Sequence, residues 1–283
     1  MPISPPLKST PILRMSTYEG CMKPHIPGPN SPVPVRTMEL ESKWIEVKGV
    51  NTHYVVGGEG LPLVLVHGGG ATGGWGEWGP FLERFARDFR VYAPDLVGFG
   101  RSDKPPANYT TRFFAEFFDA YMEAMALGRV NLIGHSLGGG VSLAYALNHP
   151  ERVEKLILVD SSGLSNELGL MGRVLIPLFT RIARIRRDHV YVSLMTGGKE
   201  REPGEIYWDR LPELQVPTLL VWGEWDGYLP VRWARMAHER IPNSELCVFE
   251  RCWHAPQKQR PEAFARVVLD FLKRREGRCC SSV

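Results

Sequence analysis

Short apolar runs and stretches of helical periodicity alternate along most of this chain. The run Leu61–Val66 is apolar on both faces and ends in a glycine-rich turn, which is typical of a buried central strand of a parallel sheet. The other predicted strands are Trp44–Val47, His53–Val56, Val91–Ala93, Val130–Ile133, Leu156–Asp160, Thr218–Trp222 and Leu246–Phe249. The predicted helices are Phe81–Phe89, Thr111–Ala126, Gly138–Asn148, Val231–Ile241 and Pro261–Lys273. Repeated strand and helix units predict an α/β fold, a mostly parallel doubly wound sheet whose first two strands form an antiparallel edge.

Proline content and this rhythm divide the chain into segments. Prolines recur every few residues in 1–36, which opposes both helix and sheet, so we expect this segment to be disordered and outside the fold. Residues 37–161 and 215–275 carry the strand and helix units and form the predicted core. Residues 162–214 interrupt the rhythm and are predicted to form a short helical cap, and 276–283 a flexible tail.

The predicted cap contains one amphipathic stretch. Its apolar face is formed by Val174, Leu178, Ile182 and Ile185, and its basic residues are Arg181, Arg184, Arg186 and Arg187. Such a helix can pack its apolar face over a pocket of the same protein or lie on a membrane surface. Because the stretch is inserted into a sheet domain, we favour a cap over a pocket.

Composition removes several classes of function. A hydrophobic content of 43% allows a sizeable core, and a formal net charge of +3 with interspersed acids does not indicate a nucleic-acid partner. The five cysteines show neither zinc-binding nor disulfide spacing. No secretory signal is visible, and no apolar run reaches the roughly 18 residues of a membrane-spanning helix. We therefore expect a cytoplasmic protein without stable membrane insertion, and the composition leaves its oligomeric state open.

The strongest chemical signal is a serine between a strand and a helix. Strand Val130–Ile133 runs into Gly134-His135-Ser136-Leu137-Gly138, which is followed by a helix rich in small residues. Glycines on both sides permit the tight turn that exposes a nucleophilic hydroxyl, and the helix start offers free N–H groups to an oxyanion. In this setting the GxSxG pattern predicts that Ser136 is a nucleophile rather than part of a glycine-flanked packing turn.

A serine nucleophile requires a base and a carboxylate that orients the base. Asp226 follows the predicted strand Thr218–Trp222, and His254 follows the next one. Loops at the carboxyl ends of parallel strands lie on one rim of the sheet, where Ser136 is also expected. We predict Asp226 as the acid and His254 as the base. Asp160, which also ends a predicted strand, is the alternative acid.

The other histidines are weaker candidates for the base, and Glu224 is close enough to Asp226 to compete for the role of acid. His149 and His238 lie within predicted helices and are interpreted as solvated or packing residues. His135 is next to the nucleophile, but the geometry of the turn is expected to point it elsewhere. His67 is interpreted as a hydrogen-bonded scaffold residue.

An oxyanion hole needs two backbone donors, one from the residue after the nucleophile and one from a loop after an earlier strand. Leu137 supplies the first, and the loop His67-Gly68-Gly69-Gly70 supplies the second, for which we favour Gly69. These glycines do not form a nucleotide site, because neither GxGxxG nor a GK[ST] ending is present. The predicted chemistry requires no cofactor and no metal.

Taken in order, these motifs resemble the α/β-hydrolase superfamily over about Ile45–Leu272. Asp95–Asp103 is similar to the turn that follows the fourth strand of that family, and Val216–Gly223 to the approach to the acid. His67–Gly70 followed by Gly73–Trp75 is similar to hydrolases that cleave carbon–carbon bonds in ring-fission products of aromatic compounds. The resemblance implies the same fold and a catalytic serine.

The chain departs from the family pattern at two places. The family usually has glycine before the base histidine, where this chain has Trp253, which is expected to crowd the loop or line the pocket. The cap is short, with few residues between Met195 and Val216. Serine at 136, rather than aspartate, argues against haloalkane dehalogenase or epoxide hydrolase chemistry.

These features predict a serine hydrolase that acts on a small to medium carboxylic ester through an acyl-enzyme. A carbon–carbon hydrolase of ring-fission diketones is the first alternative, and a ligand-binding protein that keeps the fold without turnover is the second. In each case the partner is a small molecule, an ester or a ketone.

Overall fold

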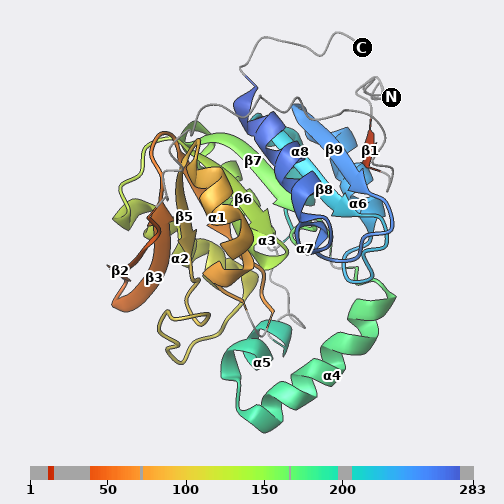
Figure 1. The fold of residues 1–283 in the computed structure, drawn as a ribbon. Coiled ribbons are helices and arrows are strands. Elements are labelled where there is room, and N and C mark those ends of the chain that lie inside the picture. The colour runs from red at the N-terminus through yellow and green to blue at the C-terminus, as the bar shows by residue number, and fades with distance from the viewer. Residues whose placement is uncertain (1–11, 16–38, 71–72, 166, 197–205, 275–283) are drawn as a thin grey trace, which may run out of the picture.

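The computed structural model describes residues 12–15, 39–70, 73–165, 167–196 and 206–274, which form a nine-stranded sheet with helices on both faces (Figure 1). The strands are β1 (Leu13–Met15), β2 (Glu41–Val47), β3 (Val50–Gly57), β4 (Pro62–Val66), β5 (Arg90–Pro94), β6 (Val130–His135), β7 (Val153–Val159), β8 (Thr218–Gly223) and β9 (Ser244–Phe249). Their order across the sheet is β1-β9-β8-β7-β6-β4-β5-β3-β2. Only the pairs β2–β3 and β3–β5 are antiparallel among the described strands. The predicted α/β class, with its antiparallel edge, is confirmed.

The core is divided by the sheet into two apolar layers. On the central strand β4, Leu63 and Leu65 belong to one layer, and Val64 and Val66 to the other, because successive side chains of a strand point to opposite faces. The helices are α1 (Gly79–Ala86), α2 (Thr111–Ala124), α3 (Leu137–Asn148), α6 (Val231–Arg240), α7 (Pro256–Gln259) and α8 (Pro261–Lys273). Helices α1 and α8 pack in the layer of Leu63, in front of the sheet in Figure 1, and α2, α3 and α6 pack in the layer of Val64.

Two further helices, α4 (Leu170–Arg186) and α5 (His189–Thr196), lie at the lower edge of Figure 1, and Val190 of α5 packs into the layer of Val64. They occur between β7 and β8, where the cap was predicted. Short 3-10 helices η1 (Trp75–Glu77), η2 (Pro150–Arg152) and η4 (Trp208–Glu213) complete the described elements. No helix in the described part of the chain has both the length and the apolar character needed to cross a membrane.

The apolar face of α4 does not pack over a pocket, so this prediction is wrong. Val174, Leu178, Ile182 and Ile185 are all exposed, and Ile185 keeps 76% of its surface in contact with solvent. The buried residues of α4 are Gly172, Thr180 and Ala183. Helical periodicity correctly gives a two-sided helix, but the side that faces the protein is the one with small residues.

The prediction that residues 1–36 lie outside the fold is wrong for three of them. Leu13–Met15 form β1, which pairs in parallel with β9. The last strand of a sheet leaves a row of free backbone N–H and C=O groups, and a short segment without proline can pair with them. Residues 1–11, 16–36 and 276–283, for which disorder or flexibility was predicted, lie outside the described residues.

Candidate active site

Ser136 lies at a sharp turn between β6 and α3. Its backbone has φ 51° and ψ −114°, a conformation that residues other than glycine rarely adopt. A side chain at Gly138 would collide with the Val66 carbonyl, and one at Gly134 with the Gly138 carbonyl, so both flanking glycines are required by space. The turn therefore holds the serine at the start of α3, where backbone N–H groups have no partner within the helix.

Asp226 and His254 are brought together from two successive loops. Nδ1 of His254 lies 2.8 Å from Asp226 Oδ2, and the other carboxylate oxygen accepts hydrogen bonds from the N–H groups of Tyr228 and Leu229. This arrangement fixes both the carboxylate and the face of the imidazole. Burial lowers the pKa of His254, against the opposing effect of Asp226, so the imidazole is neutral near pH 7 and can accept a proton.

Among the described residues, none forms a hydrogen bond with the Ser136 hydroxyl. Bonds between a nucleophile and its base are often long before substrate binds and tighten in the complex. Ser136 itself is only half-buried, so its hydroxyl remains accessible to a ligand.

Asp160 lies beside Asp226 but holds a different partner. Its carboxyl oxygen accepts the N–H of Gly223 at 2.9 Å, whereas the hydrogen bond of His254 goes to Asp226. Burial, and then the negative charge of Asp226, raise the pKa of Asp160 well above its ordinary value. Both effects favour the protonated form of Asp160, and its hydrogen bond with Gly223 supports the loop. Glu224 accepts the N–H of Arg251 and joins the two loops.

The two predicted oxyanion donors lie next to each other. A Cβ atom placed on Gly69 would be 3.1 Å from Leu137 Cδ2, so the loop after β4 approaches the start of α3. His67 shapes this loop, because its Nδ1 donates to the Gly68 carbonyl at 2.8 Å and its Nε2 accepts the N–H of Leu96 at 3.0 Å. Burial lowers the pKa of His67, which keeps the ring neutral in this scaffold role.

One buried ion pair beside the site was not predicted. Nδ1 of His135 lies 2.5 Å from Oε1 of Glu77, and the His135 ring is 5.0 Å from the ring of His254. The expectation that His135 points away from the site is therefore wrong. The same carboxylate accepts hydrogen bonds from the N–H of Gly68 and the amide of Gln257, both at 3.2 Å. The Glu77 carboxylate thus bridges three parts of the site: the loop of Gly68, the turn of His135 and Ser136, and the helix α7 that follows His254.

Electrostatics favours the ionised form of Glu77. Burial acts to raise the pKa of Glu77, but the charge and contact of His135 outweigh it and lower the pKa to about 2. Polar atoms of His135, Asp160 and His254 come within 4.8 Å of one another. In this set His135 contacts Glu77 and His254 contacts Asp226, each through Nδ1.

The remaining predicted residues lie in ordinary surroundings. Nε2 of His149 is 2.8 Å from Asp119, and Nδ1 of His238 is 2.9 Å from the Ser244 hydroxyl. Trp253 neither crowds its loop nor lies buried. Its ring is 48% exposed and packs edge-on against Trp225 at 6.0 Å between centroids.

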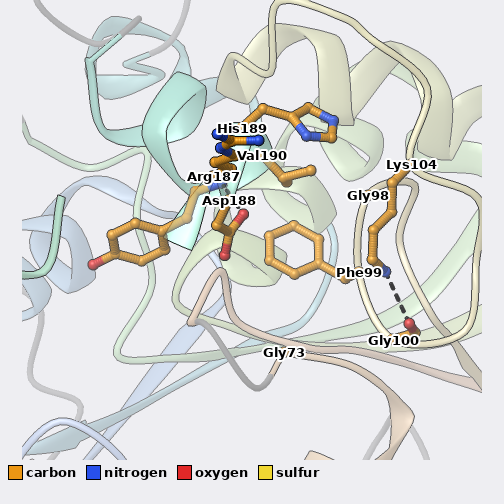
Figure 2. Close-up of a pocket in the computed structure, with 10 residues that line it drawn as sticks. Gly73, Gly98, Phe99, Gly100, Lys104, Arg187, Asp188, His189 and Val190 are labelled. Carbon is orange, nitrogen blue, oxygen red and sulfur yellow. Dashed lines mark hydrogen bonds between the residues drawn. The ribbon is translucent and has the colours of Figure 1, made fainter. Parts of the chain in front are cut away.

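A pocket of about 550 Å³ lies next to the oxyanion loop (Figure 2). Its lining includes Gly73, Phe99, Lys104, Arg187 and Asp188, and does not include Ser136, Asp226 or His254. Gly73 donates its N–H to Gly70, which ties the pocket to the loop of the predicted oxyanion hole. The Lys104 ammonium donates to the Gly100 carbonyl at 2.9 Å, the hydrogen bond drawn as a dashed line in Figure 2. The pocket therefore offers cationic groups near the site.

A second group of serine, histidine and aspartate lies in the first strands of the sheet. The hydroxyl of Ser42 is 2.6 Å from Nε2 of His53, and Nδ1 of His53 is 2.8 Å from Oδ2 of Asp95. His53 and Asp95 are fully buried, while Ser42 is exposed on the edge strand β2.

Comparison with known proteins gives a consistent picture. A family profile described as alpha/beta hydrolase fold matches residues 62–184. The chain is 31% identical over 264 residues to the 2-hydroxy-6-oxo-6-(2'-aminophenyl)hexa-2,4-dienoic acid hydrolase of Metapseudomonas resinovorans, with 82% of this chain and 91% of the relative covered. It is also 31% identical over 256 residues to the 2-hydroxymuconate semialdehyde hydrolase of Pseudomonas putida, with 79% and 91% covered.

Similar solved structures include enzymes of more than one substrate type. A membrane phospholipase A, described as a bacterial virulence factor, has a TM-score of 0.72 at 25% identity, with 82% of this chain and 86% of that chain covered. A meta-cleavage product hydrolase has a TM-score of 0.68 at 26% identity, with 81% and 97% covered.

Proposed function

Because the chain belongs to the α/β-hydrolase family, we propose that it is a serine hydrolase in which Ser136 attacks a substrate carbonyl and forms an acyl-enzyme. The observation that carries this proposal is the 2.8 Å contact between His254 and Asp226, on the rim where the strained Ser136 turn also lies. A neutral, oriented imidazole is the base that a serine hydroxyl requires.

The proposed reaction consists of the following proton transfers and bond changes. Nε2 of His254 takes the proton of Ser136 as Oγ adds to the carbonyl carbon. The N–H groups of Gly69 and Leu137 stabilise the oxyanion that forms. The imidazolium, steadied by Asp226, then protonates the leaving group as its bond to the acyl carbon breaks. Water, deprotonated by the same histidine, attacks the acyl-enzyme and releases the acid and the free serine.

A small to medium carboxylic ester is the proposed substrate. An alkoxide leaving group needs only the proton that His254 carries, so the residues already named complete the reaction without a cofactor. The half-buried Ser136, whose hydroxyl remains accessible, favours substrates that do not need to be fully enclosed.

Cleavage of a carbon–carbon bond in a 2-hydroxy-6-oxo-dienoate is the second candidate, and it is favoured by the relatives named as dienoic acid and semialdehyde hydrolases. Such a substrate carries a carboxylate. Lys104 and Arg187, in the pocket beside the oxyanion loop, are cations that could hold it.

Parallel assays separate these candidates. The purified chain is given p-nitrophenyl esters from acetate to decanoate and, separately, 2-hydroxy-6-oxo-6-phenylhexa-2,4-dienoate, with Ser136→Ala as the control. Release of p-nitrophenol while the dienoate is not consumed supports an ester as the substrate. Formation of benzoate from the dienoate, with poor ester turnover, supports carbon–carbon cleavage. Ligand binding without turnover of either substrate contradicts both and indicates a binding protein.

A further inference from the structure

The outer side of α4 is an apolar stripe that faces solvent. The exposed large apolar side chains of α4 are Leu170, Met171, Val174, Leu178, Phe179, Ile182 and Ile185. At about 100° per residue, Met171, Val174, Leu178, Ile182 and Ile185 fall within an arc of about 80° and form the stripe, and Val174, Leu178 and Ile185 lie within about 40° of it. The buried Gly172 and Ala183 point about 150° away from the middle of this narrower arc. The stripe is therefore on the side of the helix opposite to the one that contacts the protein, and Figure 1 shows α4 at the periphery of the fold.

The charge of α4 has one sign. Its charged residues are Arg173, Arg181, Arg184 and Arg186, with Arg187 directly after the helix, and all five are exposed. There is no aspartate, glutamate or lysine from Leu170 to Arg186. On the helical wheel Arg181 and Arg186 border the apolar stripe on its two sides. Asp188, the next acid in the chain, is half-buried and accepts the N–H of Tyr191.

We propose that α4 binds the surface of an anionic phospholipid bilayer, with its apolar stripe among the acyl chains and its arginines at the headgroup phosphates. A helix with a continuous apolar side and a purely basic border has the features of an interfacial helix. Soluble monomers rarely leave an apolar patch of this kind open. The purely basic border favours an anionic surface over a second copy of this chain, because two copies of α4 would bring arginines of the same sign together.

The position of α4 connects this surface to the candidate active site. Gly169 donates its N–H to the Tyr228 carbonyl at 2.8 Å, and Gly172 donates to Gly227 at 3.0 Å. Tyr228 in turn packs 5.2 Å from the ring of His254. The first turn of the membrane-binding helix is thus hydrogen-bonded to the loop of Asp226. The proposal concerns a binding surface and stands whether the substrate is an ester or a diketone.

Vesicle co-sedimentation tests this surface directly. The full chain is mixed with sedimentable vesicles of phosphatidylcholine alone or of phosphatidylcholine and phosphatidylglycerol in equal parts. We expect binding to the anionic vesicles and little to the neutral ones. Leu178→Asp should weaken anionic binding at least about tenfold, because it removes an inserted apolar side chain. The pair Arg181→Gln with Arg184→Gln should weaken it by roughly fivefold for each arginine.

Matched controls come from outside α4. Leu61→Asp replaces a leucine that is 58% exposed, against 50% for Leu178, and Arg87→Gln with Arg266→Gln removes two exposed arginines, one directly after α1 and one in α8. These variants should bind as the wild type does. Far-ultraviolet circular dichroism shows whether each variant is folded, and ester or dienoate turnover in the absence of lipid shows whether the site is intact.

Three results would overturn the proposal. One is failure of the wild type to bind anionic vesicles. Another is binding that the arginine pair weakens but Leu178→Asp does not, since the stripe then takes no part. The third is a wild-type dimer in sedimentation velocity that Leu178→Asp dissociates, without vesicle binding, because the stripe would then be an interface between two copies. A loss of turnover with vesicle binding unchanged would count against the proposed function and not against this surface.

Discussion

Two groups of serine, histidine and aspartate lie in this fold, and their histidine–aspartate distances are equal. In one, His53 is 2.8 Å from Asp95 and 2.6 Å from the Ser42 hydroxyl. In the other, His254 is 2.8 Å from Asp226, and no hydrogen bond to the Ser136 hydroxyl is formed among the described residues. By contact distance alone, the group of Ser42 looks the more complete. We nevertheless assign catalysis to the group of Ser136.

The difference lies in the backbone around each serine. Ser42 is the second residue of the extended edge strand β2, with no helix start beside it. Ser136 is held at φ 51° at the start of α3, next to the loop of Gly69. The carboxylates do not separate the two groups. Asp95 accepts the N–H groups of Trp75 and Arg101, and Asp226 accepts those of Tyr228 and Leu229. Aligned side chains are therefore insufficient for catalysis. Backbone N–H donors must also point to where the oxyanion will form.

The largest expected effect separates the two serines. Ser136→Ala should reduce kcat by roughly 10⁶-fold, to background, as expected when a nucleophile is lost. Ser42→Ala should leave kcat unchanged, because Ser42 has no oxyanion donors. The measurement is turnover of whichever substrate the wild type accepts. A large loss in Ser42→Ala with a normal melting temperature would reverse the assignment.

Substitutions of Asp226 and Asp160 should lower kcat by factors that differ by several orders of magnitude. Asp226→Asn should lower kcat by roughly 10⁴-fold, because the amide would favour the wrong tautomer of His254. Asp160→Asn should lower it less than about tenfold, since His254 is bonded to Asp226 and burial favours the uncharged form of Asp160. Asp95→Asn should act on stability and spare kcat in the folded fraction. If Asp160→Asn has the larger kinetic effect, Asp160 is the orienting acid.

The buried pair of Glu77 and His135 has no counterpart in the group of Ser42. Because the pKa of Glu77 is lowered from 4.5 to about 2, its stabilising effect is full above pH 4.5 and is lost as the pH falls toward 2. The loss amounts to about 3 kcal/mol of the free energy of unfolding. Urea unfolding of the wild type should show this component, and Glu77→Gln should lack it. If the free energies of unfolding of the wild type and of Glu77→Gln changed in parallel with pH, the stabilising contact between Glu77 and His135 would be contradicted.

The smallest expected effect is a displaced pH profile. Catalysis requires neutral His254, so kcat/KM should fall as the pH drops through the pKa of this residue. Burial lowers that pKa below its ordinary value of 6.5, so activity should persist at pH 6.5 and decline only at lower pH. The check is kcat/KM as a function of pH. A midpoint above 6.5 would show that Asp226 outweighs burial.

Local patterns in the sequence predicted much of the fold and part of the site. The buried strands, the turn at Ser136 and the loops of Asp226 and His254 were placed from runs of apolar residues and their ends. Glu77 was missed because its contact with His135 depends on how η1 packs, and no spacing encodes that. Periodicity found the two faces of α4 but not which of them meets the protein.

Labelling with a fluorophosphonate, followed by mapping of the modified peptide, tests the central assignment most directly. The reagent needs both an activated serine and oxyanion donors, so it distinguishes the two groups in one experiment. We predict a label on Ser136 in the wild type and in Ser42→Ala, and no label in Ser136→Ala. A label on Ser42, or equal labelling of the wild type and Ser136→Ala, would contradict the assignment.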